Sequence, residues 1–270
     1  MKRTRLAAAA LLLLAPSAQA GPWPVGKGKL YAKLSYEFLD SNRLAQPDGT
    51  VFGIPDFVKQ GSGLYVAWGV GDRLTLIGDV PAWRSSDLEA FAREDGFGDL
   101  RIGAQYQLGR SGPWLFATRA IVQAPTGDET RAGGLLPTGS GVWEAEAIAS
   151  VGRSFAGGSG WGFVELGHQH RSGGLTDGFL YGAQIGWNAT RGLALAASLR
   201  GVEPYSHAPK DTPIGSPVGV SDRVTYTYCG PSAIVKLGHG LAVQVDADFV
   251  FGARNLATGV TWRGALVLSR

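Results

Sequence analysis

Alternation of apolar and polar positions dominates the chain and predicts β-strands. In "FGDLRIGAQYQLG", residues 97–109, the even positions from Leu100 to Leu108 are apolar or aromatic, and the odd positions are nearly all polar. A period of two places alternate side chains on opposite faces of a strand. The same alternation recurs along the chain and predicts twelve strands, at residues 29–39, 61–70, 74–83, 97–108, 114–124, 142–153, 161–170, 179–188, 193–202, 224–237, 241–250 and 259–269.

The connections between these strands alternate in length. The short ones are residues 70–73, 109–113, 156–160, 188–192 and 238–240, and the longer ones are 40–60, 84–96, 125–141, 171–178, 203–223 and 251–258. Short turns at one end and long loops at the other are typical of outer-membrane barrels. The chain is therefore predicted to be all-β, a transmembrane antiparallel up-and-down β-barrel of about 12 strands, with both termini at the short-turn end.

One face of the predicted strands is apolar almost throughout, and the other face carries charges. In a membrane barrel the apolar face contacts lipid and the polar face lines the lumen. The charged residues that we expect to line the lumen are Lys33, Glu37, Asp79, Asp99, Arg101, Arg119, Glu144, Glu146, Glu165, Arg200, Lys236, Asp246, Asp248 and Arg263.

A soluble β-barrel or sandwich would show the same alternation with its faces reversed. Three observations favour the membrane. The strands have the length of about 10 residues that a tilted membrane strand needs. The long loops occur at one end only, and seven tryptophans lie near predicted strand ends, where an interfacial aromatic girdle would place them. These are Trp68, Trp83, Trp114, Trp143, Trp161, Trp187 and Trp262.

The first twenty residues have the pattern of a secretory signal peptide. Lys2, Arg3 and Arg5 precede an apolar run, and Ala18-Gln-Ala20 forms a small-residue cleavage site. Residues 1–20 are predicted to be removed, which leaves a barrel of residues 21–270 in the outer membrane of a Gram-negative bacterium. Removal of three cations changes 25 Lys+Arg to 22, against 22 Asp+Glu. A balanced charge gives no support to nucleic-acid binding, and the single Cys229 excludes an internal disulfide.

Two places depart from the regular pattern. In residues 224–237 the parity of Tyr226 and Tyr228 disagrees with that of Ala233 and Val235, so a β-bulge is expected at Gly230-Pro231. The chain also ends on Leu-Ser-Arg270, whereas bacterial barrels commonly finish on an aromatic residue.

A family resemblance rests on short glycine and proline motifs. The segment "GFGDLRIGAQYQL" (96–108) followed by "QAPTGDETRAGGLLPTGSGVWEAEAIASVG" (123–152) resembles the MetA-pathway of phenol degradation family of outer-membrane transporters. The matching positions are Gly96, Gly98, Asp99, Pro125, Thr126, Gly127, Asp128, Gly139, Ser140 and Gly141. The resemblance implies a barrel of about a dozen strands that moves hydrophobic or aromatic compounds. The same residues also suit strand starts and turns without any ligand.

Each group of residues that could catalyse a reaction or bind a metal also has a simpler structural interpretation. The pairs Glu144/Glu146 and Asp246/Asp248 share one strand face, but they lack the spacing of a known cation loop, which favours pore lining. The segment "HQHRS" (168–172) invites comparison with barrel lipases, which use an outward-facing Ser and His. No Asn or Asp that would orient the histidine is identifiable, and a third zinc ligand is missing. We therefore predict no enzyme, no metal site and no cofactor.

The sequence favours a passive channel for small solutes, which the family resemblance implies include aromatic or hydrophobic compounds. Expected partners are the solute and outer-membrane lipid, with no nucleic acid, and the chain is expected to be a monomer. Twelve strands fall between a barrel filled by side chains and one with an open channel. A structural or surface-interaction barrel with an occluded lumen stays open as an alternative, as does an outer-membrane lipid-acting enzyme. The loops 40–60 and 203–223 receive no role.

Overall fold

Antiparallel strands make up most of what the computed structural model describes, namely residues 21–128, 136–207 and 222–270. The predicted signal peptide and parts of the predicted loops 125–141 and 203–223 lie outside the described residues. The strands are β1 (Leu30–Ala45), β2 (Val51–Gly69), β3 (Leu74–Leu88), β4 (Ala92–Gly96), β5 (Leu100–Ser111), β6 (Trp114–Ala124), β7 (Glu144–Phe155), β8 (Gly160–Arg171), β9 (Gly178–Asn188), β10 (Leu193–Pro204), β11 (Thr225–Gly238), β12 (Leu241–Arg254), β13 (Leu256–Ala257) and β14 (Val260–Ser269).

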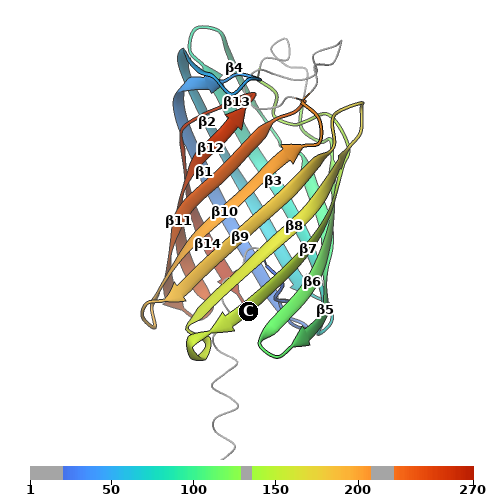
Figure 1. Ribbon diagram of the computed structural model, residues 1–270. Coiled ribbons are helices and arrows are strands. Elements are labelled where there is room, and N and C mark those ends of the chain that lie inside the picture. The colour runs from blue at the N-terminus through green and yellow to red at the C-terminus, as the bar shows by residue number, and fades with distance from the viewer. Residues whose placement is uncertain (1–20, 129–135, 208–221) are drawn as a thin grey trace, which may run out of the picture.

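The sheet closes on itself, as the tilted strands of Figure 1 show. Each barrel strand pairs with its neighbours in sequence, and β1 pairs with both β2 and β14. Twelve strands form the wall, while β4 and β13 are short additions that pair with β3 and β1. The prediction of a 12-stranded antiparallel barrel is confirmed. In the described part of the chain no helix is long and apolar enough to cross a membrane.

The two ends of the barrel differ as predicted. Five short turns join the strands at the short-turn end, where the Leu30 amide also donates to the Arg270 carbonyl oxygen. The predicted loop 40–60 is largely strand, because β1 and β2 continue to pair as far as Ala45 and Val51. Phe57 and Leu44 of this hairpin are buried in an apolar cluster with Leu39, Leu136 and Ala257. The hairpin therefore projects beyond the wall at the long-loop end. Its Pro and polar residues interrupt the apolar–polar alternation, so the sequence analysis predicted a loop there.

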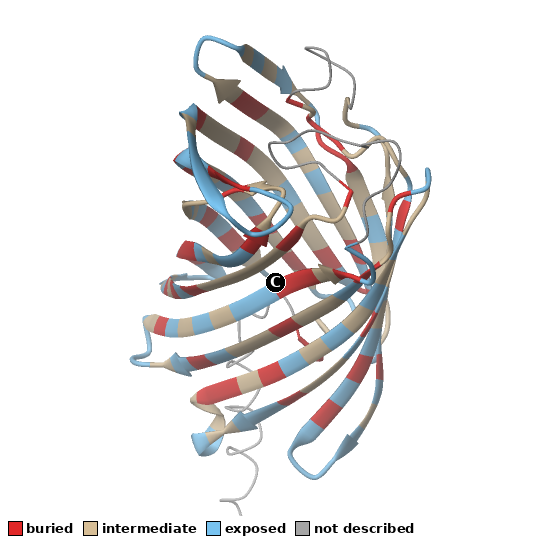
Figure 2. Ribbon diagram, turned by 45° about the horizontal axis from the view of Figure 1, so that its top comes forward, coloured by how far each residue is buried: buried red, intermediate tan, exposed pale blue. Residues whose placement is uncertain are grey.

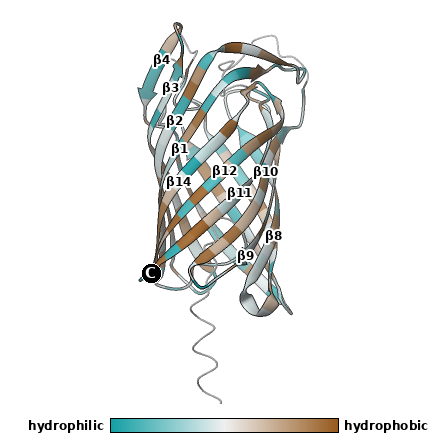
Figure 3. Cartoon of the chain, turned by 90° about the vertical axis from the view of Figure 1, so that its left-hand side faces the viewer, coloured by the Kyte–Doolittle hydropathy of each residue, from teal (hydrophilic) through white to brown (hydrophobic). Residues whose placement is uncertain are grey.

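Burial alternates along the strands and shows which face looks outward (Figure 2). The large apolar side chains of one parity are exposed, with Leu34 at 57%, Ile102 at 58% and Ile185 at 59%. Side chains of the other parity, such as Lys33 and Asp246, are buried inside the barrel. Figure 3 shows hydrophobic and hydrophilic residues alternating along the strands. The predicted outward orientation of the apolar face is confirmed.

The bulge predicted at Gly230-Pro231 is absent, so this prediction was wrong. The register of β10 against β11 runs unbroken from Leu193↔Val235 to Val202↔Tyr226. Tyr226 therefore shares its parity with the buried Ser232, and both face the lumen. The sequence analysis failed here because it took aromatic residues to be lipid-facing, whereas these tyrosines point inward.

The predicted tryptophan girdle holds for five of the seven residues, Trp68, Trp114, Trp143, Trp187 and Trp262, whose side chains are exposed on the outer face. The prediction was wrong for Trp161 and Trp83. Trp161 is only 1% exposed and donates from Nε1 to Oε1 of Gln184 at 3.1 Å inside the barrel. Trp83 lines the lumen. Both residues have inward parity, which outweighs their position near a strand end.

The outward face can be tested with one pair of substitutions. Leu166 lies mid-strand in β8 and is 56% exposed, whereas Phe91 is 67% exposed at the β3–β4 turn beyond the wall. Leu166→Arg is expected to lower the free energy of unfolding in vesicles by about 2–4 kcal/mol, because it places a charge in the bilayer core. Phe91→Arg is expected to change it by less than about 0.5 kcal/mol. Equal effects in urea titrations would contradict the assignment of the outer face to lipid.

Candidate functional site

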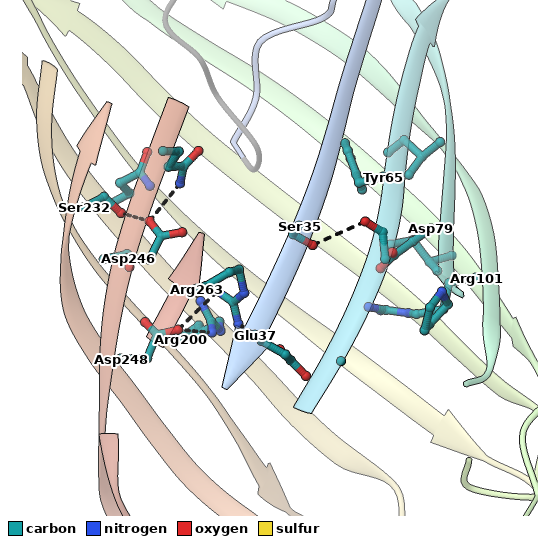
Figure 4. A pocket seen from close by; sticks show the side chains of 18 of the residues that line it. Ser35, Glu37, Tyr65, Asp79, Arg101, Arg200, Ser232, Asp246, Asp248 and Arg263 are labelled. Atoms are coloured by element: carbon teal, nitrogen blue, oxygen red, sulfur yellow. Dashed lines mark hydrogen bonds and ion pairs between the residues drawn. The ribbon is translucent and has the colours of Figure 1, made fainter. Parts of the chain in front are cut away.

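A cavity of about 430 Å³ occupies the middle of the barrel, and we call it the central chamber. Residues from most barrel strands line it, as the close-up in Figure 4 shows. Ten of the charged residues singled out from the sequence lie on its wall: Glu37, Asp79, Arg101, Arg119, Glu146, Glu165, Arg200, Asp246, Asp248 and Arg263. Strand alternation accounts for this convergence, since every second residue of a closed barrel points inward.

A second cavity of about 280 Å³, the upper chamber, lies toward the long-loop end. Asp99 and Glu144 line it, and Arg84 and Glu146 line both chambers, so the two cavities adjoin at these side chains. The remaining two predicted residues lie on neither chamber wall. Lys33 is buried with its Nζ 3.8 Å from Oδ2 of Asp246.

Lys236 lies near the short-turn end and donates from Nζ to Oδ1 of Asn188 at 2.8 Å. It lies two positions before β11 ends and does not line the central chamber. This hydrogen bond joins the end of β9 to β11.

Ion pairs follow the wall formed by β5 to β8. Nη2 of Arg101 lies 2.5 Å from Oε1 of Glu146, and Nη2 of Arg119 lies 3.1 Å from Oε2 of Glu165. In the upper chamber Arg171 Nε donates to Oε1 of Glu144 at 3.2 Å. The first two pairs reach across one intervening strand, and Arg171 and Glu144 lie opposite each other on the adjacent strands β8 and β7. Together these guanidinium groups and carboxylates form a row of ion pairs along the wall.

A second group of ion pairs lies on the wall where the barrel closes (Figure 4). Oδ2 of Asp248 accepts from Arg200 at 2.6 Å and from Arg263 at 3.3 Å. Nη2 of Arg263 also lies 3.4 Å from Oε2 of Glu37 on β1. Cations and carboxylates therefore compensate each other within the wall, and the central chamber is polar without a large field of one sign.

The N-terminal segment, residues 21–29, enters the barrel at the short-turn end, and we call it the plug. Pro22 is fully buried, and the ring of Trp23 lies edge-on to Phe163 with 6.1 Å between centroids. Gln105 Nε2 donates to the Trp23 carbonyl oxygen at 3.2 Å, and the Val25 amide donates to Oγ1 of Thr75 at 3.2 Å. Phe163 also lines the central chamber, so the plug forms part of its floor.

Below the chamber an apolar cluster surrounds the plug. Its buried members include Tyr31, Trp161 and Ile234, with Trp23 and Val25 packed against them. These apolar side chains contrast with the charged side chains that line the two chambers above them. The interior therefore divides into polar chambers and an apolar seal at the short-turn end.

The motif that carries the family resemblance fastens the loop between β6 and β7. The carboxylate of buried Asp99 accepts from the amides of Gly127 at 2.9 Å and Ser140 at 2.5 Å. It also accepts from Nε2 of Gln123 at 3.1 Å. A Cβ on Gly139 would lie 2.3 Å from Oδ1 of Asp99, so only glycine fits there. Asp99 thus fixes both described ends of this loop over the upper chamber.

Sequence reasoning missed the plug, Arg84 and Tyr226. Arg84 lies in a segment predicted as loop, and its Nη1 donates to the Thr138 carbonyl oxygen at 3.1 Å. Tyr226 was assigned to the wrong face. The plug has no alternation to detect, although the Pro-Trp-Pro sequence one residue after the predicted cleavage site was visible. Within the described residues no group of three or more His, Cys, Asp or Glu side chains could hold a metal ion.

A closed antiparallel barrel with an apolar outer face and charged internal chambers defines a transmembrane β-barrel of the outer-membrane class. Comparison with solved structures agrees. The crystal structure of the COG4313 outer membrane channel from Pseudomonas putida F1 is similar over 94% of this chain and 98% of that chain, with a TM-score of 0.67 and 16% identity.

Two further structures share the fold at lower similarity. The KdgM porin matches 88% of this chain and 99% of that chain, with a TM-score of 0.56 and 6% identity. The translocator domain of the autotransporter NalP from Neisseria meningitidis matches 90% of this chain and 88% of that one, with a TM-score of 0.51 and 13% identity. No family model and no curated protein sequence matches the chain. The similarity of this chain to the solved structures is therefore a similarity of fold.

Proposed function

We propose that the barrel lets small solutes cross the outer membrane passively, through a lumen whose two chambers are lined by compensated charges. The observation that carries this proposal is the pair of adjoining cavities, about 430 and 280 Å³, inside a closed wall. A purely structural barrel of this size would gain stability by filling that volume with apolar side chains. Paired charges instead favour hydration of the lumen without attracting ions of one sign.

The mixed lining suits neutral or zwitterionic solutes. Four of the five guanidinium groups on the central chamber wall, those of Arg101, Arg119, Arg200 and Arg263, lie 2.5–3.4 Å from a carboxylate, so a passing solute meets polar groups and little net charge. Aromatic side chains such as Tyr65, Trp83 and Phe163 add apolar patches to the same chamber. This combination supports the aromatic substrate class that the resemblance to the MetA-pathway family implies. The COG4313 structure, described as an outer membrane channel, supports the same function.

The plug favours one alternative, a barrel whose lumen stays occluded. Its Trp23 and Pro22 lie across the short-turn end, where a solute would have to leave. Passage through the proposed channel therefore requires the plug to move, and in the alternative it never does. We further propose that the chain acts as a monomer in outer-membrane lipid, and that the lumen needs neither cofactor nor covalent chemistry.

The test is single-channel recording of the refolded mature protein in a planar bilayer. Discrete conductance steps are expected in symmetric salt. Glu146→Gln leaves Arg101 uncompensated and is expected to shift the reversal potential in a salt gradient toward anion preference. Arg119→Gln leaves Glu165 uncompensated and is expected to shift it in the opposite direction, because a charge in a narrow lumen attracts its counter-ion.

Glu89→Gln, at the exposed turn between β3 and β4, is the matched control and should leave the reversal potential unchanged. A silent bilayer from protein that shows a heat-modifiable gel band would contradict the open channel and favour the occluded barrel. Steps that ignore both lumen substitutions would contradict the assignment of these residues to the conducting path.

A further inference from the structure

Two histidines and an aspartate meet on the outer surface of the barrel, outside the lumen. His168 and His170 have the outward parity of β8 near its long-loop end, and their side chains are 48% and 63% exposed. Asp177 comes from the loop that leads into β9. The sequence analysis set a hydrolase aside because it found no residue to orient His170, and this aspartate occupies that position.

The Asp177 carboxylate holds the His170 imidazole in one orientation, as it would a catalytic base. Nδ1 of His170 lies 3.1 and 3.0 Å from the two carboxylate oxygens of Asp177. The Arg171 amide donates to Oδ1 of Asp177 at 3.0 Å and fixes the carboxylate. Partial burial acts to raise the pKa of Asp177, but the hydrogen bonds from Arg171 and His170 hold it below its usual range. With Nδ1 protonated toward Asp177, Nε2 is the free base.

Ser172 supplies a hydroxyl two residues after His170. β8 ends at Arg171, so Ser172 is the first residue beyond the strand, and its side chain is not hydrogen-bonded to His170 in this structure. Residues two apart in a nearly extended chain lie about 7 Å apart, a distance that an imidazole and a serine side chain can bridge. The Ser172 hydroxyl accepts from the Trp143 amide at 3.0 Å, and the Ser172 amide donates to the Trp143 carbonyl oxygen at 2.9 Å. The serine is thus anchored beside Trp143, and its own proton can turn toward His170 when substrate binds.

The residue after the serine is a glycine in the left-handed region. Gly173 has φ +67°, and Gly174 after it has φ +77°. An amide directly after a nucleophilic serine is a common donor to the oxyanion of a tetrahedral intermediate. The sharp turn that the two glycines allow places the Gly173 amide next to the Ser172 side chain.

We propose that Ser172 and His170 form a serine-esterase site at the outer membrane boundary, positioned by Asp177, which hydrolyses acyl esters of amphiphiles. Oγ of Ser172 attacks the ester carbonyl carbon while Nε2 of His170 takes the hydroxyl proton. The C–O bond to the alcohol then breaks, and His170 returns the proton to the leaving alcohol. Water hydrolyses the acyl-serine by the same route and releases a carboxylic acid.

The surroundings of the site indicate an amphiphilic substrate. Trp143 is 57% exposed on one side, and Tyr205 is 59% exposed on the other, stacked on His168 with 5.5 Å between ring centroids. Aromatic side chains of this kind are typical of the membrane–water interface. An ester at headgroup level, with its acyl chain in the bilayer, would reach Ser172 from the lipid side. The site is therefore independent of the lumen.

The experiment uses the refolded mature barrel in detergent micelles, a fluorophosphonate probe and a 4-nitrophenyl ester of a long-chain fatty acid. Labelling of Ser172, located by mass spectrometry, and ester hydrolysis are expected together. Ser172→Ala is expected to abolish both. His170→Ala is expected to lower the hydrolysis rate by about 10²–10⁴-fold, the usual contribution of a general base.

Asp177→Asn distinguishes a positioning role from a structural one. It preserves shape but favours the wrong imidazole tautomer, so it is expected to lower the rate and change the pH–rate profile while the barrel stays folded. Ser159→Ala, at the opposite end of the same strand pair, is the matched control and should retain full labelling. Folded protein without labelling, or labelling and hydrolysis that survive Ser172→Ala, would overturn the proposal. Conductance should be unchanged by Ser172→Ala, so this result and that of the channel test are separable.

Discussion

Deleting residues 21–25 is expected to raise the single-channel conductance several-fold. These residues carry the parts of the plug that enter the barrel, including the buried Pro22 and the Trp23 ring against Phe163. Their removal leaves the strand pairing intact, because the hydrogen bonds from residues 21–25 to the described wall are those with Gln105 and Thr75. The bonds of Gly28 and Lys29 to Gly69 are retained in this variant. Single-channel recording in symmetric salt measures the effect.

Two variants separate plugging from a general disturbance of the barrel. Lys27→Ala alters an exposed residue of the same segment and should leave the conductance unchanged. Trp23→Ala removes only the ring that packs on Phe163, and it should give an intermediate conductance with more frequent openings. An unaltered conductance for the folded deletion variant would mean that solutes do not leave past the plug.

Asp99→Ala is expected to lower the free energy of unfolding by about 2–3 kcal/mol, since it leaves buried donors without their charged acceptor. The donors are the amides of Gly127 and Ser140 and the side chain of Gln123. Urea titration of the folded barrel, followed by tryptophan fluorescence, measures the change. The loop between β6 and β7 should also become sensitive to protease, because both of its described ends are tied to this carboxylate.

Asp48→Ala is the control for this prediction. Asp48 lies in an exposed turn, and its carboxylate bonds only to Thr50 two residues away in the hydrogen bonds found for it. Its loss should cost less than about 1 kcal/mol. Similar effects of the two substitutions would show that Asp99 contributes no more than an ordinary turn residue, and that other contacts hold the loop.

The wall of the barrel could be predicted from the sequence because one physical rule governs it. Lipid outside and water inside force a period of two, and this rule placed Glu37, Arg119 and Asp248 on the inner face. The same rule, applied strictly, would have placed Trp161 inside as well. Parity was a better guide than proximity to a strand end. Tyr226 was misassigned because aromatic residues were expected on the lipid face.

The features that could not be predicted depend on contacts between distant segments. The plug has no periodicity, and its position follows from packing of Trp23 on Phe163. The motif around Asp99 was visible as turn chemistry, but its hydrogen bonds join residues up to 41 positions apart. Asp177 lies seven residues after His170, and only the turn through Gly173 and Gly174 brings the two together.

The pairing of β1 with β14 bears on how the barrel assembles. Glu37 and Arg263 lie directly opposite each other in this pairing although they are 226 residues apart, so the contact forms only when both ends of the chain are present. A slip of β14 by one residue against β1 would turn Arg263 outward. Exposing an arginine to the bilayer midplane costs about 2–4 kcal/mol. The Glu37–Arg263 register therefore makes a misregistered closure of the barrel unfavourable.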